Sequence, residues 1–232
     1  MYVRNQFTNK DVYNGIILPN KIHHSWHPYI FYAFELDSMR LIKEKINTTN
    51  NYFPEKQNIF NVFQMPLHDI RVVILGQDPY YTGEAIGYAF AVDNSTYKTF
   101  SLTTIEKELG KPLLNNDLSD WIKQGVFLLN TALTVKQNTP GSHLSLWQEF
   151  TNIVISTIAR ENPCIWLLWG NAAKHYERII LQSEKYANNT NIILKAGHPA
   201  SERKNSGTFL NCNHFNLVNK YLKEKKQSLI NF

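Results

Sequence analysis

Four short runs of apolar residues, separated by segments with helical periodicity, constrain the fold of this chain most. Each run is too short for a typical helix and lacks the alternation of a half-exposed strand, so we expect strands buried on both faces. Buried strands that alternate with helices form parallel sheets with right-handed crossovers. The sequence therefore predicts an α/β fold: a central four-stranded parallel twisted sheet with helices on both faces, a three-layer sandwich. The expected strands are IRVVIL (70–75), VFLLN (126–130), CIWLLW (164–169) and NIILKA (191–196).

The segments between the strands carry helix signals. Thr103 with Glu106 and Ser145 with Gln148 have the spacing of capping boxes, and each pair predicts a helix start. Apolar spacing predicts the remaining helices, of which the second ends at Pro66 and the fourth at Gly125. The expected helices are 29–46, 57–65, one from Thr103, 118–124, 145–160, 171–181 and 213–226.

The length and composition fit one folded domain. A chain of 232 residues, 43% of them hydrophobic, can bury one sizeable core. We predict a single domain over 1–232, in which the polar residues 1–24 form a flexible or peripheral arm. The chain shows neither a signal peptide nor an apolar run long enough to cross a membrane. We therefore expect an intracellular protein, cytoplasmic, or nuclear if its source is a eukaryote or a virus.

Cysteine content and charge narrow the function classes. The two cysteines, Cys164 and Cys212, cannot build a disulfide framework or a four-cysteine zinc or iron–sulfur site. A net charge of +5 and a pI near 9.0 suit a partner that carries phosphates.

Polar side chains follow the predicted strands where each strand ends. Asp78 follows the first strand, Asn130 ends the second, Asn171 follows the third and His198 follows the fourth. The carboxyl ends of parallel strands meet at one edge of the sheet, where open α/β folds bind ligands. The sequence therefore predicts that a carboxylate, an amide and an imidazole converge over one crevice.

Each of these residues also has a structural interpretation. Asp78 could form an Asx-turn with its own backbone, and Asn130 could satisfy a carbonyl group at the strand end. His198, which precedes a proline, could be a turn histidine, and Phe90 could belong to the ordinary core. Each residue alone leaves both interpretations open, whereas the joint arrangement favours a site.

Several motifs surround these residues in a fixed order. They are GQDPY (76–80), YAFAV with Phe90, LLNTALTV with Asn130, HP at His198 and CNHF (212–215). Together they resemble the sequence signature of family 1 uracil-DNA glycosylases. The resemblance runs from about Ser25 to the C-terminal INF and covers nearly the whole chain.

The resemblance implies a reaction and its partners. The enzyme would hydrolyse the bond between uracil and deoxyribose in DNA, leaving free uracil and an abasic site for base-excision repair. It would act as a monomer without metal or cofactor, on single- and double-stranded DNA, flipping the base into a pocket. A DNA-mimicking inhibitor protein is a further partner to consider.

The resemblance also assigns roles. Asp78 and His198 would be catalytic: the carboxylate steadies the cationic sugar and orients or activates water, and the imidazole donates a hydrogen bond to uracil O2. Asn130 would pair with uracil N3–H and O4, and Phe90 would stack on the base. Tyr80 would exclude the methyl group of thymine, and the backbone around Gln77 would complete the slot.

The sequence departs from the family pattern where DNA would be contacted. Tyr81 stands where the family usually has histidine, and TFSL, with Ser101, stands for PPSL. HPASERKNSG follows the last strand and lacks the leucine that wedges into duplex DNA, which leaves Arg203 as the best candidate for that role. Ser101 could instead be a simple helix entry, and SERKNSG a solvated loop. The expected DNA contacts are Tyr81, Ser101, Asn171, Ser201 and Arg203.

Three other functions remain as alternatives at this stage. The first is a catalytically weak or inactive DNA-binding or replication scaffold of the same fold, which the joint presence of Asp78, Asn130 and His198 argues against. The second is a glycosylase of broader scope, which Tyr80 argues against. The third is a generic nucleotide-binding protein, but GQDPY stands where a glycine-rich phosphate turn would follow the first strand.

Overall fold

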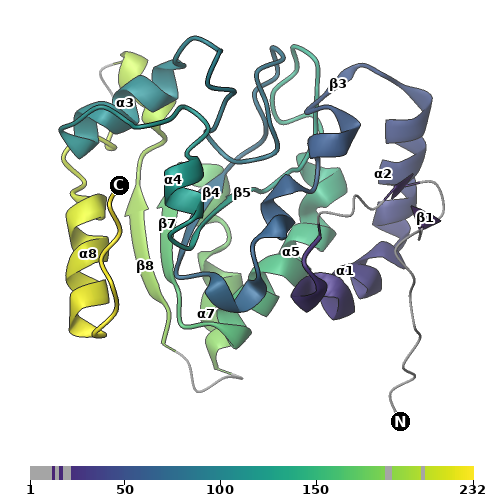
Figure 1. Cartoon of the computed structure of the whole chain (residues 1–232). Coiled ribbons are helices and arrows are strands. Elements are labelled where there is room, and N and C mark those ends of the chain that lie inside the picture. The colour runs from purple at the N-terminus through teal and green to yellow at the C-terminus, as the bar shows by residue number, and fades with distance from the viewer. Residues whose placement is uncertain (1–11, 14–15, 18–21, 186–189, 205–206) are drawn as a thin grey trace.

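The four predicted strands form one parallel sheet in the computed structural model, which describes residues 12–13, 16–17, 22–185, 190–204 and 207–232 (Figure 1). The strand order is β5-β4-β7-β8, and every pair is parallel. Each predicted strand is confirmed to within two residues. The strands are β4 (Val72–Gly76), β5 (Val126–Asn130), β7 (Ile165–Trp169) and β8 (Ile192–Ala196).

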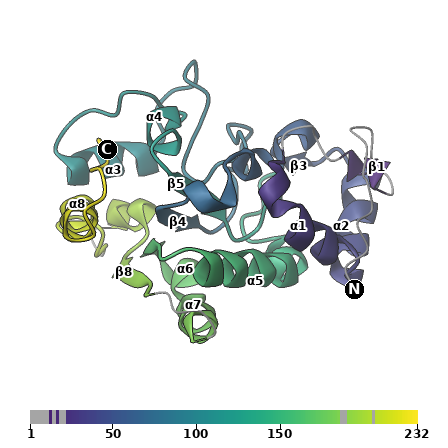
Figure 2. The ribbon, with the colours of Figure 1, turned by 60° about the horizontal axis from the view of Figure 1, so that its bottom comes forward.

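Helices cover both faces of this sheet, as predicted. Successive strand residues point to opposite faces, so Val73 and Leu75 join one core while Val72 and Ile74 join the other. Figure 2 shows α5 and α7 on one side of the sheet and α3 and α4 on the other. The first core is built with α1 (His27–Phe34), α2 (Asp37–Thr48), α5 (Leu144–Glu161) and α7 (Glu177–Glu184). The second is built with α3 (Phe100–Leu109), α4 (Ser119–Ile122) and α8 (His214–Glu224).

The expectation of strands buried on both faces holds for three of the four. Every residue of β4, β5 and β7 is buried. β8 lies at the edge of the sheet, and only its last residue, Ala196, is buried. Its Lys195 is exposed and pairs with Glu177 of α7 at 2.9 Å.

Two predicted helices are each divided in two. The segment 29–46 is divided between α1 and α2 because Leu36 has an extended backbone and packs against the core. The segment 171–181 is divided between α6 (Asn171–Lys174) and α7, and the buried Tyr176 lies between them. At the first break the backbone becomes extended at Leu36, whereas at the second Tyr176 keeps a helical backbone conformation.

The predicted helix 57–65 is wrong. The segment forms two short 3-10 helices, η2 (Lys56–Asn58) and η3 (Asn61–Gln64). Phe60, between them, has a backbone outside the helical region, and its ring is fully buried. Burial in the first core therefore decides the path of this segment, rather than helix periodicity.

Both predicted capping boxes are wrong, because both helices begin earlier. The N-cap of α3 is Thr99, whose hydroxyl accepts a backbone hydrogen bond from the first turn, so Thr103 lies inside the helix. The N-cap of α5 is His143, so the pair Ser145 and Gln148 lies inside its first turns. α4 and α8 match the helices expected over 118–124 and 213–226 with slightly shorter bounds.

The chain also forms elements that were not predicted. The strands β3 (Tyr52–Phe53) and β6 (Val135–Lys136) pair antiparallel, as do β1 (Val12–Tyr13) and β2 (Ile16–Ile17). The segment after β8, expected as a loop, forms the 3-10 helix η5 (Pro199–Lys204).

Most of the predicted N-terminal arm, residues 1–11, 14–15 and 18–21, lies outside the described residues. Its last part is held to the fold, because His23 N–H donates a hydrogen bond to the Phe63 carbonyl at 2.9 Å. Among the described residues, no helix is both long and apolar enough to cross a membrane.

Candidate active site

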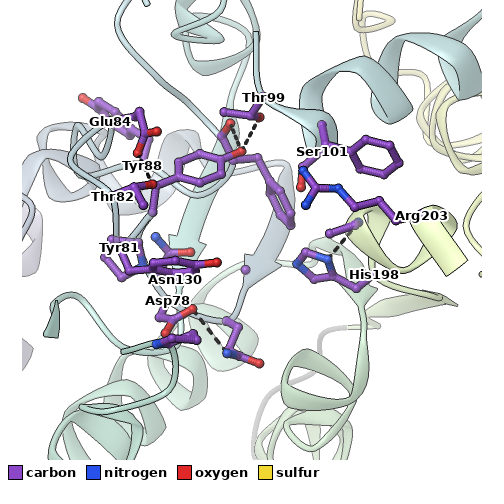
Figure 3. Close-up of a pocket in the computed structure, with 18 of the residues that line it drawn as sticks. Asp78, Tyr81, Thr82, Glu84, Tyr88, Thr99, Ser101, Asn130, His198 and Arg203 are labelled. Atoms are coloured by element: carbon purple, nitrogen blue, oxygen red, sulfur yellow. Dashed lines mark hydrogen bonds between the residues drawn. The ribbon is translucent and has the colours of Figure 1, made fainter. Parts of the chain in front are cut away.

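A pocket of about 380 Å³ lies at the carboxyl ends of β4 and β5. Figure 3 shows Asp78 and Asn130 on one side of this pocket and His198 and Arg203 on the other. The structure thus brings together side chains that the sequence places far apart. The site residues expected from the sequence that line the pocket are Gln77, Asp78, Tyr80, Tyr81, Phe90, Ser101, Asn130, His198 and Arg203.

The Asp78 carboxylate is held from two sides. Gly141 N–H donates a hydrogen bond to Oδ2, and the side chain of Gln77 donates one to Oδ1 at 3.3 Å. Burial raises the pKa of Asp78 above its ordinary value of 3.8, and these two hydrogen bonds oppose part of that shift. The backbone N–H bound to this carboxylate belongs to Gly141, 63 positions away, and Gln77 donates from its side chain, so the Asx-turn interpretation does not describe Asp78.

Sequence reasoning missed Gly141, whose loop carries the donor to Asp78. Gly141 has φ +76, a left-handed conformation that favours glycine. The loop is fixed by β6, where Lys136 N–H donates to the Ser142 hydroxyl at 2.8 Å. The signal in the sequence was the turn-forming TPG at 139–141, although its partner could not be inferred from it.

Asn130 ends β5 directly beside Gly76 of β4, its register partner. The residue is 5% exposed, and no other described residue forms a hydrogen bond with its side-chain amide. A Cβ at Gly76 would lie 2.3 Å from Asn130 Oδ1, so the amide occupies the space that glycine leaves free. The absence of a side chain at Gly76 therefore lets the amide take its place at the pocket wall.

Replacing Gly76 by alanine should displace this amide. Gly76 has an ordinary backbone conformation, so the effect comes from the clash with Asn130 and the 3.0 Å approach to Ala89 Cβ. For the uracil release that the sequence resemblance implies, we expect kcat/KM to fall about tenfold to a hundredfold, since misplacing a binding group by about 1 Å can cost that much. Steady-state kinetics on a uracil-containing oligonucleotide would measure this change. Gly110→Ala is a control for loss of stability alone, because alanine is strained at its φ of +74 but a Cβ there meets nothing within 4 Å, and Gly110 does not line the pocket. Equal kinetics for the two variants would contradict this account.

His198 is a neutral imidazole with a defined tautomer. Its Nδ1 accepts a hydrogen bond from Ala200 N–H at 3.0 Å, so the proton of the neutral ring is on Nε2. Burial lowers the pKa of His198 below 6.5. The backbone of Gly170 makes room for it, since a Cβ there would lie 3.0 Å from His198 Cβ. His198 therefore offers Nε2–H as a hydrogen-bond donor.

Phe90 and Tyr80 are fixed to each other. Phe90 has φ +65, a conformation rare for an aromatic residue, and such outliers cluster at functional sites. Its ring lies 5.6 Å from that of His198 and 5.4 Å from that of Trp169. The Tyr80 hydroxyl donates to the Phe90 carbonyl at 3.1 Å and contacts the Thr99 hydroxyl at 2.7 Å. Burial raises the pKa of Tyr80 to about 12, so its phenol is neutral.

The rim of the pocket carries aromatic and cationic groups. The Arg203 guanidinium lies over the ring of Phe100, 4.5 Å from its centre. Tyr81 is 40% exposed, and Ser101 is buried in the first turn of α3. All of these groups line the pocket. Sequence reasoning missed Phe100 as the partner of Arg203.

Two expected DNA contacts lie outside the pocket lining. Asn171 begins α6 with its side chain exposed. The Ser201 hydroxyl donates to the His198 carbonyl at 2.6 Å and so fixes the turn that holds the imidazole. Among the described residues, no group of three or more His, Cys, Asp or Glu side chains could hold a metal ion.

The pocket places groups of different charge character on opposite sides of the space that a ligand would occupy. A partly buried carboxylate lies on one side, a neutral N–H donor on the other, and an amide with free donor and acceptor atoms lines the wall between β4 and β5. Such a site suits a reaction in which positive charge develops near Asp78 and negative charge near His198.

Known proteins share these sequence and fold features. Among solved structures, mimivirus uracil-DNA glycosylase has a TM-score of 0.78 at 24% identity, over 89% of this chain and 85% of that chain. The UNG of Nitratifractor salsuginis has a TM-score of 0.60 at 19% identity, over 89% of this chain and 90% of that chain. At these identities, the likeness concerns the fold alone.

The sequence comparisons reach further. The uracil-DNA glycosylase of Borreliella burgdorferi is 38% identical over 226 residues, covering 91% of this chain and 98% of the relative. That of Fusobacterium nucleatum is 39% identical over 216 residues, covering 88% of this chain and 92% of the relative. The sequence model described as "Uracil DNA glycosylase superfamily" matches residues 63–223. This chain therefore belongs to the uracil-DNA glycosylase superfamily.

Proposed function

We propose that this protein is a family 1 uracil-DNA glycosylase, which hydrolyses the N-glycosidic bond of deoxyuridine in DNA during base-excision repair. The observation that carries the proposal is the pocket in which the Asp78 carboxylate, the Asn130 amide and the neutral His198 donor lie together. The motifs GQDPY (76–80) and HP (198–199) support the assignment to family 1.

Asp78 acts on the sugar. As the bond between C1′ and N1 breaks, its electron pair stays with uracil and the sugar becomes an oxocarbenium-like cation. The ionised carboxylate stabilises this cation and orients the water that adds to C1′. The proton lost by the water passes to the carboxylate or to solvent, and the products are free uracil and an abasic site.

His198 acts on the leaving base. Uracil departs as a delocalised anion, so a hydrogen bond to O2 can replace full protonation. The tautomer fixed by Ala200 N–H places the proton on Nε2, where it can be donated. Because the ring is already neutral and oriented, this stabilisation needs no rearrangement during the reaction.

Asn130 selects the base. Its carbonyl oxygen accepts from uracil N3–H and its NH2 group donates to O4, whereas cytosine presents the opposite pattern. A mismatched buried polar pair costs about 1 to 3 kcal/mol. This selection requires the amide to keep one orientation, and the packing of the strand end over Gly76 restricts where the amide can lie.

Tyr80 and Phe90 shape the slot. Tyr80 closes the position where thymine carries its methyl group, and Phe90 stacks on the flipped ring. Their shared hydrogen bond keeps the wall and the stacking ring at a fixed separation.

Uracil release from a single-stranded oligonucleotide with one uracil tests this function. We expect release by the wild type, none from a matched thymine oligonucleotide, and a large loss in the Asp78→Asn variant. Tight DNA binding without release would instead favour the scaffold interpretation.

We expect faster release of uracil from single-stranded than from duplex DNA. Duplex substrates add the free energy of unstacking the base, and residues 199–207 contain no leucine to fill the gap. Arg203 can stack on a base and contact a phosphate, so Arg203→Ala should slow duplex cleavage about tenfold, and more than single-strand cleavage. Lys107→Ala, which removes a positive charge from α3 outside the pocket lining, is the control. Equal wild-type rates on the two substrates would refute the expectation.

The proposal extends to partners. We propose that the protein works as a monomer without cofactor on uracil-containing single- and double-stranded DNA, in the cytoplasm, or in the nucleus if its source is eukaryotic or viral. A DNA-mimicking inhibitor would occupy the rim formed by Tyr81, Phe100 and Arg203. A mimivirus UNG variant of the same fold has been solved in complex with UGI.

A further inference from the structure

A chain of hydrogen bonds joins the start of α3 to the wall of the base slot. Leu102 N–H lies 3.3 Å from the Thr99 hydroxyl, which lies 2.7 Å from the Tyr80 hydroxyl. The Tyr80 hydroxyl in turn lies 3.1 Å from the Phe90 carbonyl. The chain thus ends on the residue whose ring would stack on the base.

The protons in this chain have one consistent direction. A carbonyl oxygen can only accept, so the single proton of the Tyr80 hydroxyl goes to Phe90. The Tyr80 oxygen is then the acceptor in its contact with Thr99, which must donate. Thr99 in turn accepts from Leu102 N–H, as an N-cap does.

Thr99 is therefore both a helix cap and the donor to Tyr80. It is 9% exposed and lines the same pocket as Tyr80 and Phe90. If its hydroxyl were lost, the Tyr80 oxygen would keep its bond to Phe90 and its contact with the Ser101 side chain, but it would lose the short contact with Thr99 that holds the phenol at the start of α3. The edge of the slot would then be less sharply defined.

We propose that Thr99 is a positioning residue for base selection, which holds the Tyr80 ring where it admits hydrogen at C5 of uracil and excludes a larger group. The inference rests on the proposed function, in which Tyr80 forms the wall at C5. It assigns a role to the first residue of TFSL, the segment in which the sequence pointed only to Ser101.

The test compares three bases of increasing size at C5. Single-stranded oligonucleotides would carry uracil, 5-fluorouracil or 5-bromouracil. Bromine is about as large as the methyl group of thymine, and 5-bromouracil is a better leaving group than thymine. Thr99→Val removes the hydroxyl but keeps the shape, and we expect the preference for uracil over 5-bromouracil to fall about fivefold, the effect of one hydrogen bond. The change for 5-fluorouracil should be smaller.

Two control variants separate positioning from helix stability. Thr99→Ser keeps the cap and the donor and should restore the wild-type preference. Thr103→Val removes a hydroxyl from the same helix that donates to the Thr99 carbonyl and not to Tyr80, so it should leave the preference unchanged. Equal slowing of all three substrates by Thr99→Val would reduce Thr99 to a structural cap and overturn the inference.

A second comparison places the effect on Tyr80. Tyr80→Phe breaks the chain at the next link, so the double variant with Thr99→Val should show no larger loss of preference than Tyr80→Phe alone. Additive losses would overturn the inference.

Binding of free uracil and free 5-bromouracil, measured by calorimetry, gives a readout independent of catalysis. Wild-type protein that binds uracil without releasing it from DNA would contradict the proposed function while still testing Thr99. A pocket that binds neither base would overturn both.

Discussion

Replacing Asp78 by asparagine is expected to slow uracil release by about a thousandfold. The amide keeps the shape of the side chain and one acceptor for Gly141 N–H, but it carries no charge to stabilise the sugar cation. Removal of a preorganised charge or of a proton acceptor typically costs about 10²- to 10⁴-fold. Single-turnover kinetics on the single-stranded substrate would isolate the chemical step from product release.

A second pocket carboxylate provides the control for Asp78→Asn. Glu84 lines the same pocket but is hydrogen-bonded to Thr82 and Tyr97 at the rim. Glu84→Gln should therefore change the rate of the chemical step only slightly. A similar loss in both variants would show that the pocket responds to net charge and not to a carboxylate at one position.

Although Asp78→Asn should slow the reaction, it should make the protein more stable relative to wild type as the pH rises. A raised pKa means that folded Asp78 binds its proton more tightly than in the unfolded chain, so its contribution to stability is lost as the pH rises above 3.8 through the folded pKa. Asparagine does not ionise and escapes this loss. The melting temperature of the variant relative to wild type should therefore rise across that pH range, and a constant difference would contradict the burial argument.

The sheet could be predicted from the sequence because its signal is local. Runs such as VFLLN (126–130) are buried almost regardless of their neighbours, so apolar content and length were sufficient. The helix break at Leu36 was not predictable, because it accompanies the packing of this side chain against a core assembled from distant segments. Capping was misassigned at α3 because Thr99, Thr103 and Thr104 all stand near its start.

The site also contains residues that the sequence predicts and residues that it does not. Asp78, Asn130 and His198 follow strands, and parallel pairing alone brings strand ends to one edge. Gly141 and Thr99 act through contacts with Asp78 and Tyr80, which lie 63 and 19 positions away in the sequence. No local pattern marks such a contact. The sequence therefore supplies the groups that would face the substrate, and the tertiary structure supplies those that hold them.

Replacing His198 by alanine should slow uracil release by about 10²- to 10³-fold, the usual cost of removing a hydrogen bond to a developing anion. His198→Gln is the informative companion, because its terminal NH2 can reach toward the same position as Nε2–H and should recover part of the rate. If glutamine and alanine were equally slow, the role of His198 would lie in its ring contact with Phe90 and not in hydrogen-bond donation.

The pH profile decides the charge on that donor. With its pKa lowered below 6.5, His198 is neutral above that pH, so wild-type kcat/KM should be flat from pH 6.5 upward until other groups titrate. On the acid side the rate should fall as Asp78 takes up its proton, at a pH above 3.8 because burial raises the pKa of that carboxyl group. An active imidazolium would produce the reverse, a rate that falls as the pH rises through the pKa of His198.

Protonation would also turn Nδ1 from an acceptor into a donor facing Ala200 N–H, which would disrupt the contact that orients the ring. The neutral form is thus the one that the surrounding backbone stabilises.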